Sequence, residues 1–230
     1  MNIPVAVMFT GGKDSTYALH WAILHSFDVR VLVSIKPKRE NSWMFHYPSV
    51  EITNLQALAL DMPHELHYVS GIKDKEIEEL KNILLEVRKN YNVRGIVTGA
   101  LLSDYQRMNF NLVCEELGLK VYSPLWRKKQ DKYLIELIES GFKIILTAIY
   151  AMGIPLRLLG KVLDRDDALE IIRLSKKFGF NPAFEGGEAE TLVIDAPLFK
   201  KRIEILKYDV KKEGPYSYRL ILKDVRLIDK

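Results

Sequence analysis

The first half of the chain alternates short apolar runs with segments that have helical spacing. The apolar runs lie at residues 5–9, 29–35, 65–69, 94–99 and 119–122, and the helical segments lie at about 15–25, up to 61, 74–91 and 103–117. Short, bounded apolar runs are typical of strands that are buried on both faces of a parallel sheet. The alternation therefore predicts an α/β fold with a doubly wound, Rossmann-like parallel sheet.

The pattern changes after Trp126. Helices are expected at about residues 131–139 and 166–178, and strands at 142–149, 192–194, 203–210 and 218–228. No internal repeat or long linker separates the two parts. We therefore expect a second, smaller α+β domain, with one domain at residues 1–127 and the other at 128–230.

Charge and hydropathy narrow the functional classes. The 34 Lys and Arg residues against 30 Asp and Glu give a net charge of +4, which permits nucleic-acid binding but does not indicate it. The longest uncharged runs have 13 residues, short of the roughly 20 that span a bilayer. The first cation, Lys13, follows the first apolar run, unlike the order in a secretory leader. We expect a cytoplasmic protein without a membrane segment.

Cys114 is the single cysteine of the chain. One thiol excludes an internal disulfide, a Cys-rich zinc site and chemistry that needs two thiols on this chain. Its position inside a predicted helix favours a small core residue. The histidines at positions 20, 25, 64 and 67 are also expected to be structural, whereas His46 is either packed among aromatic residues or in contact with a phosphate or substrate.

Residues 9–16 read Phe-Thr-Gly-Gly-Lys-Asp-Ser-Thr, where the first strand gives way to the first helix. Paired glycines let backbone N–H groups form an anion-binding nest, and the helix start adds partial positive charge. The side chains that would serve phosphates and a magnesium ion are those of Lys13, Asp14, Ser15 and Thr16. The spacing is not that of the Walker loop. The alternative is an ordinary Gly-Gly turn before a capped helix.

This stretch resembles the PP-loop, Ser-Gly-Gly-x-Asp-Ser, of the ATP pyrophosphatases, with Thr10 in place of the first serine. The replacement keeps a hydroxyl group. Members of that superfamily cleave ATP between the α and β phosphates. The resemblance therefore implies an adenylating enzyme that uses ATP and Mg²⁺ and has the adenine nucleotide alpha hydrolase type of fold.

Other stretches resemble the diphthine–ammonia ligase family, over nearly the whole chain. They are Ser42-Trp-Met-Phe-His46, Gly99-Ala-Leu-Leu-Ser-Asp-Tyr-Gln-Arg107, Ser123-Pro-Leu-Trp126, Leu159-Gly160, Glu185-Gly-Gly-Glu-Ala-Glu-Thr191 and Asp195-Ala-Pro197. That family amidates the carboxylate of diphthine on elongation factor two with ammonium, in the last step of diphthamide biosynthesis, and releases AMP and pyrophosphate. Ala189 stands where the family commonly has an aromatic residue.

The resemblance implies three groups of site residues. The ATP contacts would be Thr10, Gly11, Gly12, Lys13, Asp14, Ser15, Thr16, Ser34, Ile35, Lys36, Gly99, Asp104 and Arg107. The substrate contacts would be His46, Tyr105, Gln106, Trp126, Glu185, Gly186, Gly187, Glu188, Glu190, Thr191 and Asp195. The catalytic residues would be Lys13, Ser15, Glu188 and Glu190. Since clustered carboxylates attract cations and accept protons, the two glutamates are expected to capture ammonium, although a solvated acidic turn would look similar.

Two other functions stay open. A PP-loop sulfur transferase acting on tRNA would share the loop, but the single thiol and the mild positive charge argue against it. A regulatory module could bind an adenine nucleotide without turnover. Neither the metal ligands nor the oligomeric state follows from the sequence, and a homodimer remains one option. Without a recognisable glutaminase segment, the chain is expected to use free ammonium.

Overall fold

The computed structural model describes residues 2–38 and 52–230, and its chain divides into two compact units, Met1–Arg127 and Lys128–Lys230. In the described ranges, no helix is long and apolar enough to cross a membrane.

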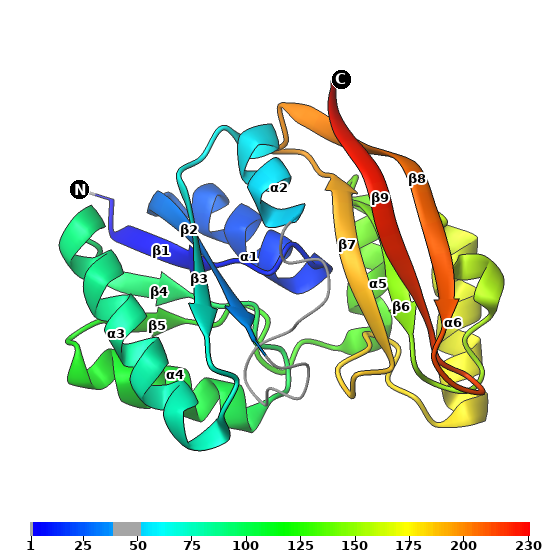
Figure 1. Ribbon diagram of the computed structural model, residues 1–230, viewed down its shortest axis with the longest axis horizontal. Helices are drawn as coiled ribbons and strands as arrows, with labels where there is room; N and C mark the ends of the chain where they lie inside the picture. Colours follow the sequence, from blue (N-terminus) through cyan, green and yellow to red (C-terminus); the bar gives the residue numbers. More distant parts are fainter. Residues whose placement is uncertain (1, 39–51) are drawn as a thin grey trace. The chain divides into compact units, whose positions relative to one another are not determined.

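Unit 1 is a five-stranded parallel sheet with helices on both faces (Figure 1). Its elements are β1 (Pro4–Met8), α1 (Lys13–Leu24), β2 (Asp28–Pro37), α2 (Ile52–Leu60), β3 (His64–Val69), α3 (Lys73–Tyr91), β4 (Gly95–Val97), α4 (Asp104–Glu116) and β5 (Lys120–Tyr122). The strand order is β3-β2-β1-β4-β5, and all neighbouring strands are parallel. The predicted doubly wound α/β fold is confirmed.

The chain reverses its direction across the sheet at β1. It first runs outward through β2 to β3, and then crosses back to β4 and β5. Right-handed crossovers therefore put α1 and α2 on one face of the sheet, and α3 and α4 on the other. The carboxyl ends of β1 and β4, which are neighbours, flank this switch point. Sheets of this kind bind their ligands at such a point.

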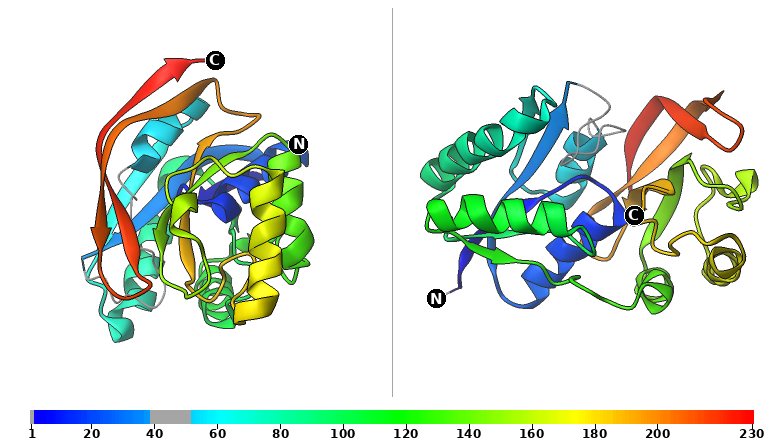
Figure 2. Two further views of the ribbon diagram at one scale, coloured as in Figure 1. Left: turned by 90° about the vertical axis from the view of Figure 1, so that its right-hand side faces the viewer. Right: turned by 90° about the horizontal axis from the view of Figure 1, so that it is seen from below.

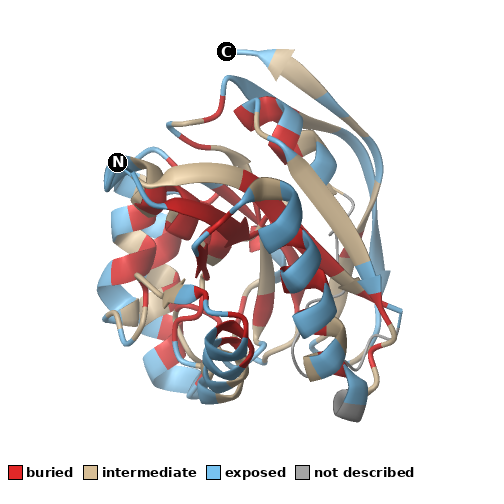
Figure 3. Cartoon of the chain, turned by 90° about the vertical axis from the view of Figure 1, so that its left-hand side faces the viewer, coloured by how far each residue is buried: buried red, intermediate tan, exposed pale blue. Residues whose placement is uncertain are grey.

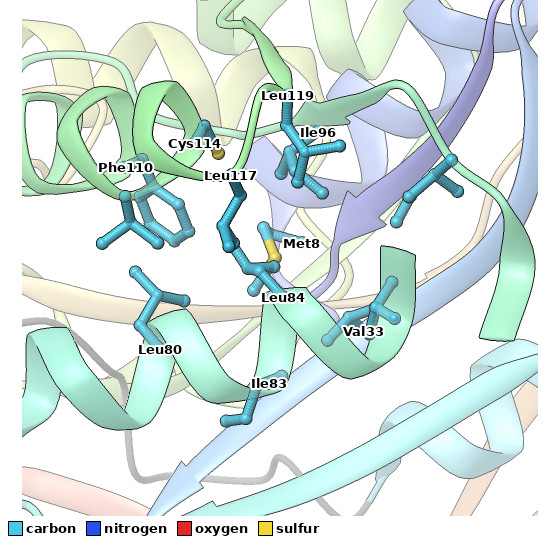
Figure 4. Packing of buried hydrophobic residues seen from close by; sticks show 14 of the residues in the cluster. Met8, Val33, Leu80, Ile83, Leu84, Ile96, Phe110, Cys114, Leu117 and Leu119 are labelled. Carbon is cyan, nitrogen blue, oxygen red and sulfur yellow. The ribbon is translucent and has the colours of Figure 1, made fainter. Parts of the chain in front are cut away.

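The core of unit 1 lies on both faces of β1, whose five residues are all buried. On one face, Leu80 and Leu84 of α3 and Phe110 of α4 pack against Met8 and Val33 of the sheet (Figure 4). Figure 3 shows these strands as the buried layer, with helices whose outer faces are exposed. Burial on both faces explains why the strand sequences are continuously apolar.

Cys114 belongs to this core and is fully buried, as its helical position predicted. Burial raises the pKa of its thiol to about 12, so the thiol stays protonated and unreactive at mildly alkaline pH. We expect a colorimetric thiol reagent to leave the folded chain unlabelled, and to label its one cysteine after unfolding in guanidinium. Rapid labelling of the folded protein would contradict this buried position.

Unit 2 has the predicted α+β class. Its elements are α5 (Gln130–Glu139), β6 (Lys143–Ile149), the short 3₁₀ helix η1 (Leu156–Leu158), α6 (Arg165–Phe178), β7 (Ala189–Asp195), β8 (Lys201–Lys212) and β9 (Tyr218–Asp229). The antiparallel strand order is β7-β6-β9-β8, and Figure 2 shows β8 and β9 as a long, curved hairpin. Strand β7 begins at Ala189 rather than at Leu192, because residues expected in a turn pair with β6.

Local sequence sets the limits of α6. The Asp164 side chain accepts a hydrogen bond from the Asp167 N–H, and the Asp167 side chain accepts one from the Asp164 N–H, which makes a capping box. Gly179 ends the helix with a φ of 78°, a left-handed conformation that favours glycine.

Candidate active site

Residues Thr10–Thr16 join β1 to α1 at the switch point of the sheet. Gly12 is the N-cap residue of α1 and gives the helix no side-chain cap, so the N–H groups of the first turn are available to a ligand. Gly11 has a φ of +76°. This left-handed conformation costs free energy for a residue that carries a side chain. A glycine-rich turn on a helix N-terminus is a favourable site for an anion.

The hydroxyl groups of the loop bind its own backbone. Thr16 Oγ1 and Ser15 Oγ donate to the Gly12 carbonyl, at 2.9 and 3.2 Å. The Thr10 N–H donates to Ser15 Oγ at 3.1 Å. Both Ser15 and Thr16 are buried. These hydrogen bonds hold the shape of the loop, and direct contact of the two hydroxyls with a phosphate stays a prediction.

Lys13 and Asp14 form an ion pair at the start of α1. Lys13 is only 2% exposed, and its Nζ lies 2.7 Å from Asp14 Oδ2. Within the described residues, the buried Asp14 Oδ1 has no hydrogen-bond partner. Leaving such an oxygen unpaired costs free energy, and a cation would satisfy it.

Asp14 therefore fits a magnesium ion that is bound mainly by phosphates. Mg²⁺ in such sites takes one or two carboxylates, together with phosphate oxygens and water. Among the residues that the structure describes, no group of three or more acidic, histidine or cysteine side chains could hold a metal ion. One carboxylate oxygen beside an anion-binding loop is thus the donor that this site offers.

Gln56 of α2 contacts the loop, which the sequence analysis did not predict. It is fully buried, and its Nε2 donates to the Gly11 carbonyl at 2.8 Å. Opposite it, a Cβ atom on Gly99 would come within 2.8 Å of the backbone at Asp14 and Ser15. The loop therefore lies between α2 and the backbone that follows β4. The available sequence signal was a lone amide within the apolar residues 55–60.

Ser34 connects β2 to the start of the same loop. It is buried, and its Oγ donates to the Phe9 carbonyl at 2.6 Å. His64 Nε2 lies 2.7 Å from the same Oγ and donates to it, since the one hydroxyl proton is already used. Burial lowers the pKa of His64, His67 adds to this effect, and Glu65 opposes it. His64 therefore has the expected structural role.

The neighbouring positions of β2 offer a ligand mainly their backbone. The Ile35 side chain packs in the core cluster, and Lys36 follows near the carboxyl end of the strand. The expectation that residues 34–36 contact adenine through the backbone is compatible with this placement and stays a prediction.

Helix α4 brings Arg107 to Trp126. The Arg107 guanidinium carbon lies 4.3 Å from the centre of the indole ring, within the range of a cation–π contact. Asp104 is exposed in the first turn of α4, the Gln106 N–H donates to the Ser103 cap, and Tyr105 packs against the core. Arg107 and Trp126 are therefore in contact, although Arg107 was expected to bind ATP and Trp126 to bind the substrate.

Glu188 organises the loop before β7 in unit 2. Its Oε1 accepts from the Asn181 N–H, and its Oε2 accepts from the Gly186 N–H, both at 2.8 Å. Its backbone carbonyl accepts from the Tyr150 N–H. Gly187, which precedes Glu188, has a φ of +79°. Because both carboxylate oxygens bind backbone, this geometry favours a structural role for Glu188.

Replacing Glu188 by Gln should destabilise unit 2. The amide keeps one acceptor, but its NH₂ group would face a backbone N–H, so one of the two hydrogen bonds is lost. We expect the free energy of unfolding to fall by about 1 to 3 kcal/mol, measured by urea denaturation. Exposed Glu139 on α5, replaced by Gln, serves as the control. A stability equal to that of the wild type would show that these loop bonds contribute little.

Glu190 has different surroundings. It pairs with Ala148 of β6, and Ala148 pairs in turn with Arg219 of β9, so the three side chains share one face of the sheet. Arg219 donates to the Tyr150 hydroxyl and forms an ion pair with Glu213, each at 3.3 Å. Burial raises the pKa of Tyr150, Arg219 opposes this shift, and Glu190 adds to it.

The other residues assigned to the acidic cluster lie on both sides of Glu190. Glu185, Gly186 and Gly187 precede β7, and Thr191 lies within it. Asp195 is at the far end of the strand, about 16 Å from Glu190 at about 3.3 Å per residue, and it binds Lys230 at 2.5 Å. Asp195 is therefore not grouped with the glutamates. His46 lies outside the described residues.

Comparison with known proteins identifies the family. The model of the diphthamide synthase N-terminal domain matches residues 3–121, and that of the C-terminal domain matches residues 129–227. The chain belongs to the diphthamide synthase family. The segment Thr10–Thr16 lies within the first match, and the segment Glu185–Thr191 lies within the second.

Curated relatives of this diphthamide synthase family member carry the name diphthine–ammonia ligase. The human protein is 32% identical over an alignment of 250 positions, which covers 98% of this chain and 93% of the human protein. The cattle protein is 31% identical with the same coverage. The Schizosaccharomyces pombe protein is 37% identical over 88% of this chain and 36% of its own length.

Proposed function

We propose that this chain is a C–N bond-forming ligase that amidates the carboxylate of diphthine on elongation factor two. It would use ATP and ammonium, release AMP and pyrophosphate, and act in the cytoplasm. The matches to diphthine–ammonia ligases over nearly the whole chain support the reaction. The structural observation that carries it is the anion-binding loop at the switch point, with the Lys13–Asp14 pair at its helix start.

The first step forms an acyl-adenylate. A diphthine carboxylate oxygen attacks the α-phosphorus of ATP, the bond from this phosphorus to the bridging oxygen breaks, and pyrophosphate leaves with the electron pair. The loop N–H groups and Lys13 bind the negative charge that develops on pyrophosphate. Bound Mg²⁺ would supply further charge neutralisation, and Asp14 is the residue that would hold it.

The second step uses Glu190. Its carboxylate accepts a proton from ammonium, and the ammonia attacks the acyl carbon. The bond between this carbon and the AMP oxygen breaks, AMP leaves, and the new amide loses its extra proton to water. Arg219 and Lys211 both form ion pairs with Glu213, so the proposed capture of ammonium rests on the Glu190 carboxylate itself.

Product analysis tests the proposal. Elongation factor two that bears diphthine, purified from a strain lacking this gene, is incubated with the chain, ATP, Mg²⁺ and ammonium. We expect AMP, pyrophosphate and the amide in equal amounts. ADP and orthophosphate would exclude the PP-loop reaction, and ATP binding without turnover would favour a regulatory module.

A further inference from the structure

We propose that Gln56 is a positioning residue of the phosphate site. Its amide holds the Gly11 carbonyl and thereby directs the Gly12 N–H toward the phosphates. This inference rests on the proposed phosphate-binding function of residues 10–16, and it assigns to α2 a part in that site.

The contact between Gln56 and the loop is direct and tight. Gln56 Nε2 donates to the Gly11 carbonyl at 2.8 Å. A Cβ atom built on Gly11 would lie 2.1 Å from Gln56 Oε1, which is closer than any real contact. The glutamine side chain thus occupies the space that any side chain at position 11 would need. The absence of a side chain at Gly11 leaves the space that the buried Gln56 side chain occupies.

Because the peptide unit is planar, the hydrogen bond to the Gly11 carbonyl also fixes the direction of the Gly12 N–H. In a trans peptide the carbonyl and the following N–H lie in one plane and point in opposite directions, and the described part of the chain has no cis peptide. When Gln56 binds the Gly11 carbonyl from one side, the Gly12 N–H must point to the other side. That side is the helix start, where the anion would bind.

The next peptide of the loop is held in the same way. The Gly12 carbonyl accepts from the Thr16 N–H and Oγ1, at 3.1 and 2.9 Å, so the Lys13 N–H points away from these donors. Successive N–H groups aimed at one point form an anion-binding nest. Thr16 thus fixes the direction of the Lys13 N–H from within the loop, and Gln56 fixes the direction of the Gly12 N–H from α2.

The Gln56 amide is buried on α2. Its neighbours on the buried side include Ala57, Ala59 and Leu60, and burying an amide among such residues is unfavourable unless its groups are bonded. An apolar side chain of similar size would fill the space but could not donate to the Gly11 carbonyl.

Calorimetric titration of the full chain tests this assignment with inorganic pyrophosphate, ATP and adenosine as ligands. Gln56→Met keeps the length of the side chain and removes the donor. We expect it to weaken pyrophosphate and ATP binding about tenfold to a hundredfold, which corresponds to the loss of one hydrogen bond to a charged group. Adenosine binding should be unchanged. Val87→Ala, a core change on the opposite face of the sheet, controls for lost stability.

Gln56→Glu provides a second readout. An ionised carboxylate has no donor for the Gly11 carbonyl, whereas a protonated one regains it. The ratio of variant to wild-type pyrophosphate affinity should therefore rise toward one as the pH falls. A ratio that does not change with pH overturns the inference, even if Gln56→Met fails to fold.

The controls separate this inference from the proposed function. A wild-type chain that binds ATP no more tightly than adenosine would overturn the phosphate role of the loop itself. A wild-type chain that prefers ATP, together with Gln56 variants that keep full pyrophosphate affinity, would overturn the role of Gln56 alone.

Discussion

Replacing Lys13 by Ala should lower the rate of acyl-adenylate formation about 10²- to 10³-fold, the usual cost of removing one preorganised charge-stabilising group. Lys13 is buried at the start of α1, where its ammonium group pairs with Asp14. Without it, the Asp14 carboxylate would face the phosphates of ATP and repel them. The rate is measured by trapping the adenylate with hydroxylamine while pyrophosphate release is followed.

Lys89→Ala, a change at an exposed residue in the last turn of α3, is the matched control. Its adenylation rate should equal that of the wild type. Circular dichroism should show the same secondary structure in both variants. Near-normal adenylation by folded Lys13→Ala would remove Lys13 from the phosphate site.

Replacing Glu190 by Gln should slow the ammonia-dependent step by about 10²- to 10⁴-fold, the typical cost of losing a general base. Gln keeps the size of the side chain but removes the charge and the proton acceptor. Adenylate formation, assigned to unit 1, should persist. The two steps are separated by trapping the adenylate with hydroxylamine and by varying the ammonium concentration.

The matched control is Glu139→Gln, which alters an exposed carboxylate on α5 of the same unit. Glu188→Gln provides a further contrast, because its expected defect is in the stability of a loop. If Glu190→Gln keeps the normal rate and the normal dependence on ammonium, the nucleophile is deprotonated elsewhere.

The architecture of unit 1 could be predicted because its sheet is buried on both faces. The residues of β1 are then uniformly apolar, and their run at positions 5–9 differs clearly from the spaced apolar positions of α3, such as Leu80, Leu84 and Val87. Local signals also predicted the turn at Gly11 and Gly12 between β1 and α1, and its binding of phosphate stays a prediction.

The environment of individual side chains could not be predicted in this way. Gln56 meets Gly11 across 45 positions of sequence, and Arg107 meets Trp126 only after α4 and β5 have folded. Local spacing gives no information on such contacts. In sequence, Gln56 is one of three polar residues of α2, with Thr53 and Asn54, and its contact with the loop follows only from the tertiary structure.

In unit 2, the different surroundings of Glu188 and Glu190 could not be predicted from the sequence either. In sequence, Glu188 and Glu190 appear equivalent, two positions apart in a Gly-rich stretch. In the structure, Glu188 binds two backbone N–H groups of its loop, whereas Glu190 lies on a strand in register with Ala148 and Arg219. Because β7 begins at Ala189, Glu190 belongs to the strand, whereas Glu188 belongs to the loop before it.

Transfer of an oxygen isotope from the diphthine carboxylate to AMP would demonstrate the acyl-adenylate. Elongation factor two carrying diphthine with an ¹⁸O-labelled carboxylate is incubated with the chain, ATP, Mg²⁺ and ammonium, and the nucleotide product is analysed by mass spectrometry. An acyl-adenylate leaves one carboxylate oxygen on the phosphate when ammonia displaces AMP, so we expect AMP that contains ¹⁸O. Unlabelled AMP, or ADP as the product, would contradict this expectation.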